Sequence, residues 1–162
     1  VVSSDLLRTR ETTEALRERL DDPSVEFTRE WRERDLGVYQ GLKYEDMLER
    51  FPAFALGEAA ARAAAEVPDG GESILGMRER VMAAWSSVAE TAGTTLVVTH
   101  GGPIHQVLGH AKGMDVATAV TDHEQANCAI NEFTVDDAVE VRRENATPWE
   151  AVARREREGF EE

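Results

Sequence analysis

The sequence predicts an α/β protein in which a mainly parallel sheet is flanked by helices, and three observations support this prediction. Helical patterns alternate with short apolar segments along the chain. The segment 94–99 is a continuous apolar and β-branched run, as expected for a strand that is buried on both faces of a parallel sheet. This run ends in His-Gly-Gly-Pro, and proline is well suited to the first turn of a following helix.

The start of the chain predicts a strand end followed by a helix. Residues 1–2 resemble the last residues of a strand, and the polar residues 3–5 are suitable N-caps for a helix that runs to about Leu20. We expect Leu6, Leu16 and Leu20 to lie on one buried face of this helix. The sequence Asp-Asp-Pro then ends it.

The middle of the chain predicts mostly helices. Proline separates two short helical patterns, and a Gly-rich loop ends in Ser73, which is a suitable N-cap for a long helix. The predicted elements are a short strand near 25–27, an irregular segment at 31–42, helices at 44–51 and 54–66, a loop at 68–73, and a helix that buries Met77, Val81, Trp85 and Val88.

The last third of the chain predicts a strand, a helix and a hairpin. The predicted elements are the strand at 94–99, a helix from Pro103 to Lys112, hairpin strands at 129–135 and 138–143, and at most a surface helix at 148–162. We expect one domain over residues 1–145, followed by a charged C-terminal tail over residues 146–162.

The composition is that of a globular protein that folds without a disulfide framework. The chain has 162 residues, of which 41% are hydrophobic and 31% charged, so it can bury a sizeable core as one soluble domain. No apolar run approaches the roughly 20 residues that a membrane span needs, and we expect a cytoplasmic protein. The lone cysteine, Cys128, excludes an internal disulfide and a Cys-rich zinc site.

The chain is strongly acidic, with 18 Lys+Arg against 32 Asp+Glu and a formal net charge of −14. This charge argues against nucleic acid and anionic membranes as partners, because both attract cationic surfaces. Two interpretations of the acidic surface stay open. It keeps the protein soluble by self-repulsion, or it is an adaptation to high salt, which screens that repulsion. In either case an anionic ligand needs a local basic pocket.

His100 is the candidate functional residue with the clearest structural context. It follows the predicted strand at 94–99 and precedes a helix, and ligands of open α/β sheets bind at such strand ends. The N–H groups at the helix start suit an anion, and Gly101 and Gly102 allow the backbone to approach a ligand. The alternative is that His100 only caps a neighbouring loop.

Two side chains elsewhere could take part in such a site. Arg8 lies one turn into the first predicted helix, and its planar guanidinium suits phosphate. The alternative is that it is a solvated ion-pair partner, as is usual for an arginine on an acidic helix. The sequence does not distinguish Arg10 from Arg8 in this respect. Glu33 lies between two arginines and could act as a general acid if burial keeps it protonated. His105 and His110 do not share a helix face, so we predict no metal and no cofactor.

Four segments together resemble the histidine phosphatase superfamily in its phosphoglycerate mutase-like branch. They are Ser-Ser-Asp-Leu-Leu-Arg-Thr (3–9), Glu-Arg-Asp-Leu-Gly-Val-Tyr-Gln-Gly-Leu (33–42), Gly-Glu-Ser (71–73) and Val-Val-Thr-His-Gly-Gly (97–102). The resemblance covers about Val1 to Val141. It implies the phosphoglycerate mutase-like fold, with a mainly parallel sheet flanked by helices, and a small phosphorylated metabolite as the partner.

The resemblance also implies a phosphohistidine mechanism that uses no metal. In this mechanism a nucleophilic histidine attacks phosphorus, and a carboxylic acid protonates the departing oxygen. By motif, Arg8 corresponds to the second arginine of the phosphate pocket, Glu33 to the proton donor, and His100 to the second histidine at the phosphoryl group. The backbone N–H of Gly101 would lie there too. The Gly-Glu-Ser motif places two more residues near the rim of the pocket, Glu72 and Ser73.

The family's Arg-His-Gly segment has no counterpart in these 162 residues. In the family, this segment follows the first strand and supplies the nucleophilic histidine and the first phosphate arginine. We expect it to precede Val1, and we expect the chain as given to be inactive without it. A sheet that lacks this strand would expose unpaired edges, so a homo-oligomer that fills the gap is one partner hypothesis.

The same resemblance helps to distinguish a phosphatase from a mutase. Mutases of this branch carry a long insertion after Gln-Gly-Leu, whereas here only residues 43–68 separate Leu42 from the Gly-rich loop. The short connection favours a phosphatase with an open pocket. It does not identify the substrate, because Phe51, Phe54 and Leu56 could line an apolar rim or belong to the core. The alternatives are a phosphoglycerate mutase and a non-catalytic remnant that binds anions.

Overall fold

A computed structural model describes residues 1–21, 23–50, 60–121 and 124–150 of the chain. Contacts within the chain divide it into two compact units, Val1–Asp122 and His123–Glu162. No helix in the described ranges is long and apolar enough to span a bilayer.

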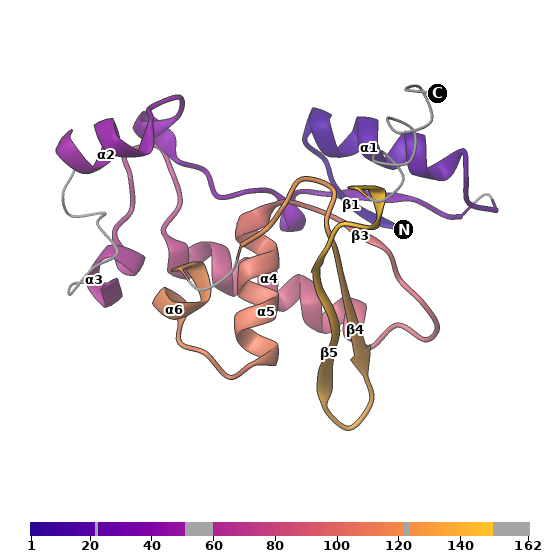
Figure 1. The fold of residues 1–162 in the computed structure, drawn as a ribbon. Coiled ribbons are helices and arrows are strands. Elements are labelled where there is room, and N and C mark those ends of the chain that lie inside the picture. Colours follow the sequence, from indigo (N-terminus) through magenta and orange to yellow (C-terminus); the bar gives the residue numbers. More distant parts are fainter. Residues whose placement is uncertain (22, 51–59, 122–123, 151–162) are drawn as a thin grey trace, which may run out of the picture. The chain divides into compact units, whose positions relative to one another are not determined.

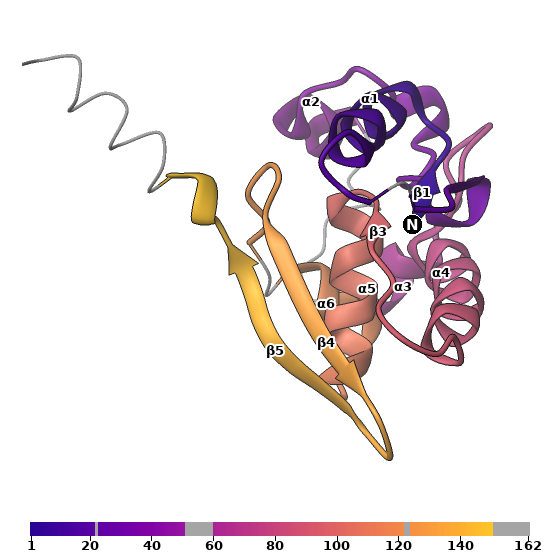
Figure 2. The same ribbon diagram turned by 90° about the vertical axis from the view of Figure 1, so that its right-hand side faces the viewer.

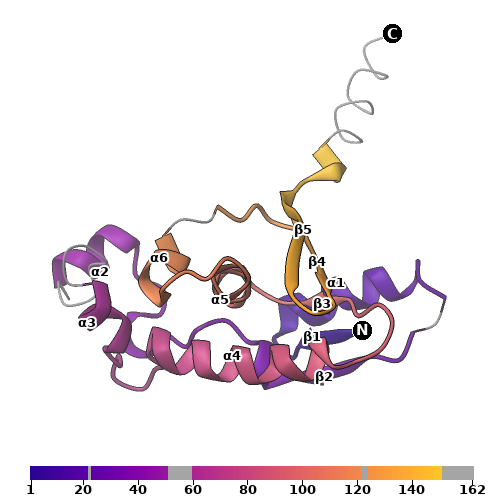
Figure 3. The same cartoon turned by 90° about the horizontal axis from the view of Figure 1, so that it is seen from below.

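The N-terminal unit contains a three-stranded parallel sheet with the order β2-β1-β3, of which Figure 1 labels β1 and β3 and Figure 3 labels all three strands. The central strand is β1 (Val2–Ser4), and its neighbours are β2 (Glu26–Thr28) and β3 (Val97–Val98). In the register of the sheet, Val2 lies opposite both Glu26 and Val97. The parallel pairing confirms the predicted α/β class, and it brings the carboxyl ends of the three strands to one edge.

Helices complete the N-terminal unit and supply most of its core. α4 (Ile74–Ala89) packs against α5 (Gly101–Ala111), as Figure 3 shows, and α5 packs against α6 (Val116–Thr121). The predicted apolar stripe of α4 is confirmed for Met77, Val81 and Trp85, which are buried. The remaining helical elements are α1 (Leu7–Arg17), η1 (Arg29–Trp31), η2 (Gly37–Tyr39), α2 (Tyr44–Arg50) and α3 (Ala60–Ala65).

The prediction for the first helix is wrong in its buried face and its ends. α1 ends at Arg17, and two of the three leucines of its predicted stripe are exposed, Leu16 at 37% and Leu20 at 43%. The third, Leu6, is partly buried and precedes the helix. Its buried face consists of Thr9 and Thr13, because this face packs on polar groups of β1: the Thr13 hydroxyl donates to Ser3 Oγ over 2.9 Å.

The predicted N-caps of that helix have other roles. Ser3 and Ser4 belong to β1, and the carboxylate of Asp5 accepts two hydrogen bonds from the guanidinium of Arg32. The N-cap position is occupied by Leu6, which has extended backbone and no side chain able to cap.

The strand predicted at 94–99 is much shorter than expected. Only Val97 and Val98 form the strand, opposite Val2 and Ser3 of β1, although the carbonyl of Leu96 also accepts the N–H of Val2 over 2.9 Å. Leu96 is 40% exposed, so the expectation of burial on both faces is wrong for this part of the run.

The two predicted short helices are only partly described. α2 agrees with its prediction to within one residue, and α3 covers the end of the predicted helix 54–66. The proposed apolar rim residues Phe51, Phe54 and Leu56 lie outside the described residues.

The C-terminal unit is a β-hairpin, as predicted (Figure 2). β4 (Ile130–Val135) pairs antiparallel with β5 (Val139–Ala146), which ends three residues later than predicted. The side chain of Asn131 ties the base of the hairpin to the preceding segment, since its amide donates to Gln125 Oε1 over 2.8 Å. Of the predicted tail helix, the structure describes residues 148–150, which are helical.

Candidate functional site

The carboxyl ends of β1 and β3 bring Ser4 and His100 together. β3 ends two residues before His100, which is the N-cap of α5, and β1 ends at Ser4. The imidazole Nε2 of His100 lies 2.8 Å from Ser4 Oγ. His100 is 8% exposed and Ser4 is fully buried, so the contact is shielded from water.

Arg8 approaches the other side of the same imidazole. It lies on the first turn of α1, and its Nε–H donates to His100 Nδ1 over 3.2 Å. A guanidinium has no acceptor atom, so Nδ1 must carry a lone pair and not a proton. Of the two neutral tautomers of the ring, this contact therefore favours the one that carries the proton on Nε2.

The surroundings of His100 favour this neutral form. Burial of the ring, together with the positive charges of Arg8 and then Arg80, lowers the pKa of His100 to about 4, while the negative charge of Glu33 opposes the shift. His100 is consequently uncharged near neutral pH, and Arg8 is the cation that contacts it.

The lowered pKa of His100 predicts a loss of stability in mild acid. Between pH 6.5, where a free histidine titrates, and pH about 4, the unfolded chain binds a proton at His100 that the folded chain does not. The free energy of unfolding should therefore fall by about 3 kcal/mol as the pH drops through this window. Urea denaturation at a series of pH values measures it, with His100→Gln as the control that lacks the titrating group. Parallel pH profiles of the two proteins would contradict the assignment.

Glu33 lies at the start of the helix that His100 caps. Its Oε2 accepts the backbone N–H of Gly102 over 3.1 Å, and its Oε1 accepts the N–H of Arg34 over 2.8 Å. The carboxylate thus interacts with the positive end of α5, where a negative charge is favoured. Gly102 leaves room for it, because a Cβ there would overlap Glu33 Oε1.

A set of arginine contacts holds the segment that carries Glu33. Arg80 of α4 donates from Nη1 to the backbone carbonyls of Glu30 (2.7 Å) and Arg32 (3.2 Å). The same guanidinium forms a two-pronged ion pair with the Glu72 carboxylate, at 2.9 and 2.7 Å. Arg34 donates from Nε to the backbone carbonyl of Glu72 over 2.8 Å, and burial lowers its pKa. The segment is therefore fixed on both sides of Glu33.

Replacing Arg80 with lysine should destabilise the fold. Lysine keeps the charge but cannot reach Glu72 and the backbone carbonyls of Glu30 and Arg32 at the same time. We expect the free energy of unfolding to fall by about 1–3 kcal/mol, because partly buried carbonyls lose their donor. The matched control is Arg17→Lys on α1, where the guanidinium is 47% exposed and lies 4.0 Å from Glu14. That change should stay within about 0.5 kcal/mol in the same urea titration, and equal effects would contradict the role given to Arg80.

The structure brings Arg8, Glu33 and His100 to one edge of the sheet, with Gly101 as the first residue of α5. The glutamate and the serine of the Gly-Glu-Ser motif both make structural contacts. Glu72 pairs with Arg80, and the Ser73 hydroxyl caps α4 by accepting the N–H of Gly76 over 2.9 Å.

Sequence reasoning did not single out Ser4 or Arg80 as residues of the site. It expected Gly102 to make room for a ligand, whereas in the structure Gly102 makes room for Glu33. Ser4 was identifiable in principle, since it ends a strand beside Arg8 in the sequence and strand ends of a parallel sheet share one edge. Nothing in the sequence distinguishes Arg80 from the other arginine of its helix, Arg78.

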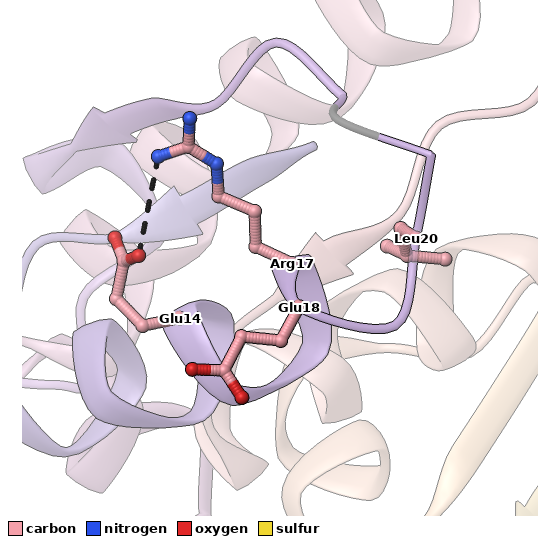
Figure 4. Close-up of a pocket in the computed structure, with 4 residues that line it drawn as sticks. All are labelled: Glu14, Arg17, Glu18 and Leu20. Atoms are coloured by element: carbon pink, nitrogen blue, oxygen red, sulfur yellow. Dashed lines mark ion pairs between the residues drawn. The ribbon is translucent and has the colours of Figure 1, made fainter.

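A separate open depression lies at the carboxyl end of α1 (Figure 4). It is lined by Glu14, Arg17, Glu18 and Leu20, and the Arg17–Glu14 pair spans 4.0 Å. Two carboxylates beside one guanidinium make it unsuited to an anion. Over residues 1–21, 23–50, 60–121 and 124–150, no group of three or more His, Cys, Asp or Glu side chains is arranged to hold a metal ion.

These features define an α/β protein in which an arginine, a histidine and a carboxylate meet at the carboxyl edge of a parallel sheet. The sequence profile of the histidine phosphatase superfamily (branch 1) matches residues 1–147. The chain therefore belongs to the histidine phosphatase superfamily, as its motifs predicted.

Individual relatives agree with this assignment. The chain is 30% identical over 139 residues to phosphoglycerate mutase-like protein 4 of Arabidopsis thaliana, covering 85% of this chain and 59% of the relative. It is also 30% identical over 109 residues to the metal-independent phosphoserine phosphatase of the same plant, covering 66% and 46%. The chain thus spans about half the length of these curated relatives.

A solved structure shows the same fold. YhfR of Bacillus stearothermophilus superposes with a TM-score of 0.77 at 21% identity, covering 90% of this chain and 73% of that chain. This confirms the phosphoglycerate mutase-like arrangement of a parallel sheet flanked by helices.

Proposed function

We propose that the complete protein hydrolyses phosphomonoesters of small metabolites through a phosphohistidine intermediate, without a metal. The observation that carries this proposal is that Arg8, His100 and Glu33 lie at one edge of the sheet. Arg8 contacts His100, and Glu33 binds the start of α5, the helix that His100 caps. The family assignment and the metal-independent phosphatase among the relatives support it.

In this proposal Arg8 and His100 bind the oxygens of the transferred phosphoryl group. Arg8 contacts His100 through Nε, so both of its Nη groups can bind two oxygens of one phosphoryl group. The N–H of Gly101, at the start of α5, adds a donor there. A bound phosphoryl dianion favours the protonated imidazole. Nδ1 then gains a proton, gives up its contact with Arg8 Nε and can donate to a phosphoryl oxygen, while Nε2 stays bound to Ser4.

Glu33 is the proposed proton donor. It is a carboxylate in the free site, and the negative charge of a bound phosphoryl group favours its protonated form. In the first half-reaction a P–N bond to the nucleophilic histidine forms and the P–O bond to the leaving group breaks, while the Glu33 carboxyl passes its proton to the departing oxygen. In the second half-reaction the Glu33 carboxylate takes a proton from water, and the oxygen of that water displaces the histidine from phosphorus. Inorganic phosphate leaves, and Glu33 is again protonated.

The proposed nucleophile belongs to an Arg-His-Gly segment that these 162 residues do not contain. His100 is unsuited to that role, since Ser4 and Arg8 occupy both of its ring nitrogens. We therefore expect the 162-residue chain by itself to bind phosphate without turnover.

The experiment compares two proteins in the hydrolysis of p-nitrophenyl phosphate with a chelator present. One is the 162-residue chain, and the other, the extended protein, adds the in-frame coding sequence upstream of Val1. We expect that sequence to encode an apolar strand followed by Arg-His-Gly, and the extended protein alone to release p-nitrophenolate. An extended protein with this segment but no hydrolysis would contradict the proposal, as would turnover by the shorter chain. Isomerisation of phosphoglycerate without release of phosphate would favour a mutase instead.

A further inference from the structure

The contact between Ser4 and His100 has a consequence for the chemistry of the imidazole. We propose that Ser4 is a positioning residue of the site: its hydroxyl oxygen accepts the Nε2–H of His100, fixes the neutral tautomer that carries the proton on Nε2, and keeps Nδ1 turned toward Arg8. The role in phosphoryl transfer rests on the proposed function, whereas the tautomer follows from the geometry alone.

The direction of this hydrogen bond follows from the groups around it. The Nε–H of Arg8 is directed at Nδ1 over 3.2 Å, and a proton on Nδ1 would oppose it. Nε2 must then carry the proton of the neutral ring, and Ser4 Oγ, at 2.8 Å, is its acceptor. The same oxygen also accepts the backbone N–H of Leu6 over 3.4 Å, so the hydroxyl acts as an acceptor toward both groups.

Ser4 is itself held rigidly. Its backbone carbonyl accepts hydrogen bonds from the hydroxyls of Ser3 and Thr9, each over 2.9 Å. Ser4 also lies in β1, where it is opposite Thr28 of β2. All of this network is shielded from water, since Ser3 and Ser4 are fully buried and Thr9 is 4% exposed. The acceptor for His100 is therefore in place before any ligand arrives.

The buried threonine face of α1 has a function in this interpretation. Thr9 and Thr13 replace the leucines expected on that face, and their hydroxyls bond to the backbone of Ser4 and to the side chain of Ser3. An apolar face would leave these polar groups of β1 without donors. α1 thus holds Ser4 in place through Thr9 and also carries Arg8, which contacts the imidazole.

Histidine-selective 15N NMR of the 162-residue chain tests the tautomer directly. At neutral pH we expect His100 to show one protonated nitrogen, Nε2, and one bare nitrogen, Nδ1. In Ser4→Ala the ring loses its acceptor and exchanges between orientations and tautomers, so the two nitrogen resonances should move toward each other. Ser3→Ala is the matched control, because it removes a neighbouring buried hydroxyl that does not contact His100.

Two results would overturn the inference. One is a wild-type His100 that carries its proton on Nδ1 or is charged at neutral pH, a result that does not depend on whether any variant folds. The other is a folded Ser4→Ala protein with the wild-type nitrogen pattern.

The role in catalysis has a separate readout in the extended protein. A misplacement of about 1 Å in a functional group can lower the rate about 100-fold, so loss of the partner that orients His100 should lower activity. We expect Ser4→Ala to lower kcat for p-nitrophenyl phosphate by at least about tenfold and Ser3→Ala by much less. Wild-type kcat in a Ser4→Ala protein whose tautomer has shifted would overturn the positioning role. A wild-type extended protein that hydrolyses nothing would contradict the proposed function, and the NMR result would still decide the tautomer.

Discussion

Gly102→Ala is expected to displace Glu33 and to abolish most of the activity of the extended protein. A Cβ at residue 102 would overlap Glu33 Oε1 and lie 3.1 Å from the sulfur of Met77. The overlapping atom is a carboxylate oxygen that also accepts the N–H of Arg34, so it cannot move without losing a hydrogen bond. Overpacking of this kind lowers the free energy of unfolding by about 1–3 kcal/mol, and a shift of about 1 Å in a catalytic group lowers the rate about 100-fold.

Gly101→Ala is the matched control for this prediction. It makes the same chemical change one residue earlier in the first turn of α5, where a Cβ would meet nothing within 4 Å. We expect Gly101→Ala to unfold at the same urea concentration as the wild type, to within about 0.5 kcal/mol in free energy. Steady-state hydrolysis and urea denaturation of both variants provide the comparison. Equal losses of kcat and of unfolding free energy in the two variants would show that Gly102 is not needed to make room for Glu33.

Glu33→Gln should lower kcat most for substrates with poor leaving groups. Glutamine keeps the acceptor for the N–H of Gly102 but has no acidic proton to give. General acid catalysis contributes about 10²–10⁴-fold, and a nitrophenolate needs this proton far less than an alkoxide does. We therefore expect a loss of about 100-fold or more with an alkyl phosphate such as phosphoserine, and a clearly smaller loss with p-nitrophenyl phosphate.

Two features make this prediction specific to proton donation. Glu26→Gln, which removes an exposed carboxylate from β2, should leave both substrates unaffected. A loss in Glu33→Gln that is equal for the two leaving groups would instead indicate a structural or electrostatic role. Measuring kcat for both substrates with all three proteins separates these outcomes.

Sequence patterns predicted most of the elements whose signals are local. The stripe of Met77, Val81 and Trp85 recurs at helical spacing, and Ser73 is a cap that needs only Gly76 three residues away. The hairpin turn was likewise visible in a few residues. Each of these depends on contacts between near neighbours in the chain, which a single sequence displays.

The errors occurred where distant segments decide the outcome. Leu16 and Leu20 have the right spacing for a buried face, but β1 presents buried serines that need hydroxyl partners, so Thr9 and Thr13 face the sheet. The extent of β3 likewise depends on its pairing with β1, which lies far away in the sequence.

The same distinction applies to the site. The residues of the family motifs were identified in advance, but their mutual contacts were not, because His100 lies 92 positions from Arg8 and 96 from Ser4. Arg80 could not be singled out at all, since its role depends on carbonyl groups of a segment about 50 residues earlier. Contacts of this kind follow from the parallel pairing of short strands, which only the fold shows.

The most direct measurement of the central claim is to trap the phosphoenzyme of the extended protein with radiolabelled phosphomonoester and to map the labelled peptide. We predict an acid-labile, alkali-stable label, as expected for a phosphoramidate, on the histidine of the Arg-His-Gly segment. The label should form with a chelator present and should decay more slowly in Glu33→Gln, which lacks the base for the attacking water. Label on His100, or on a serine or aspartate of the chain, would contradict the account.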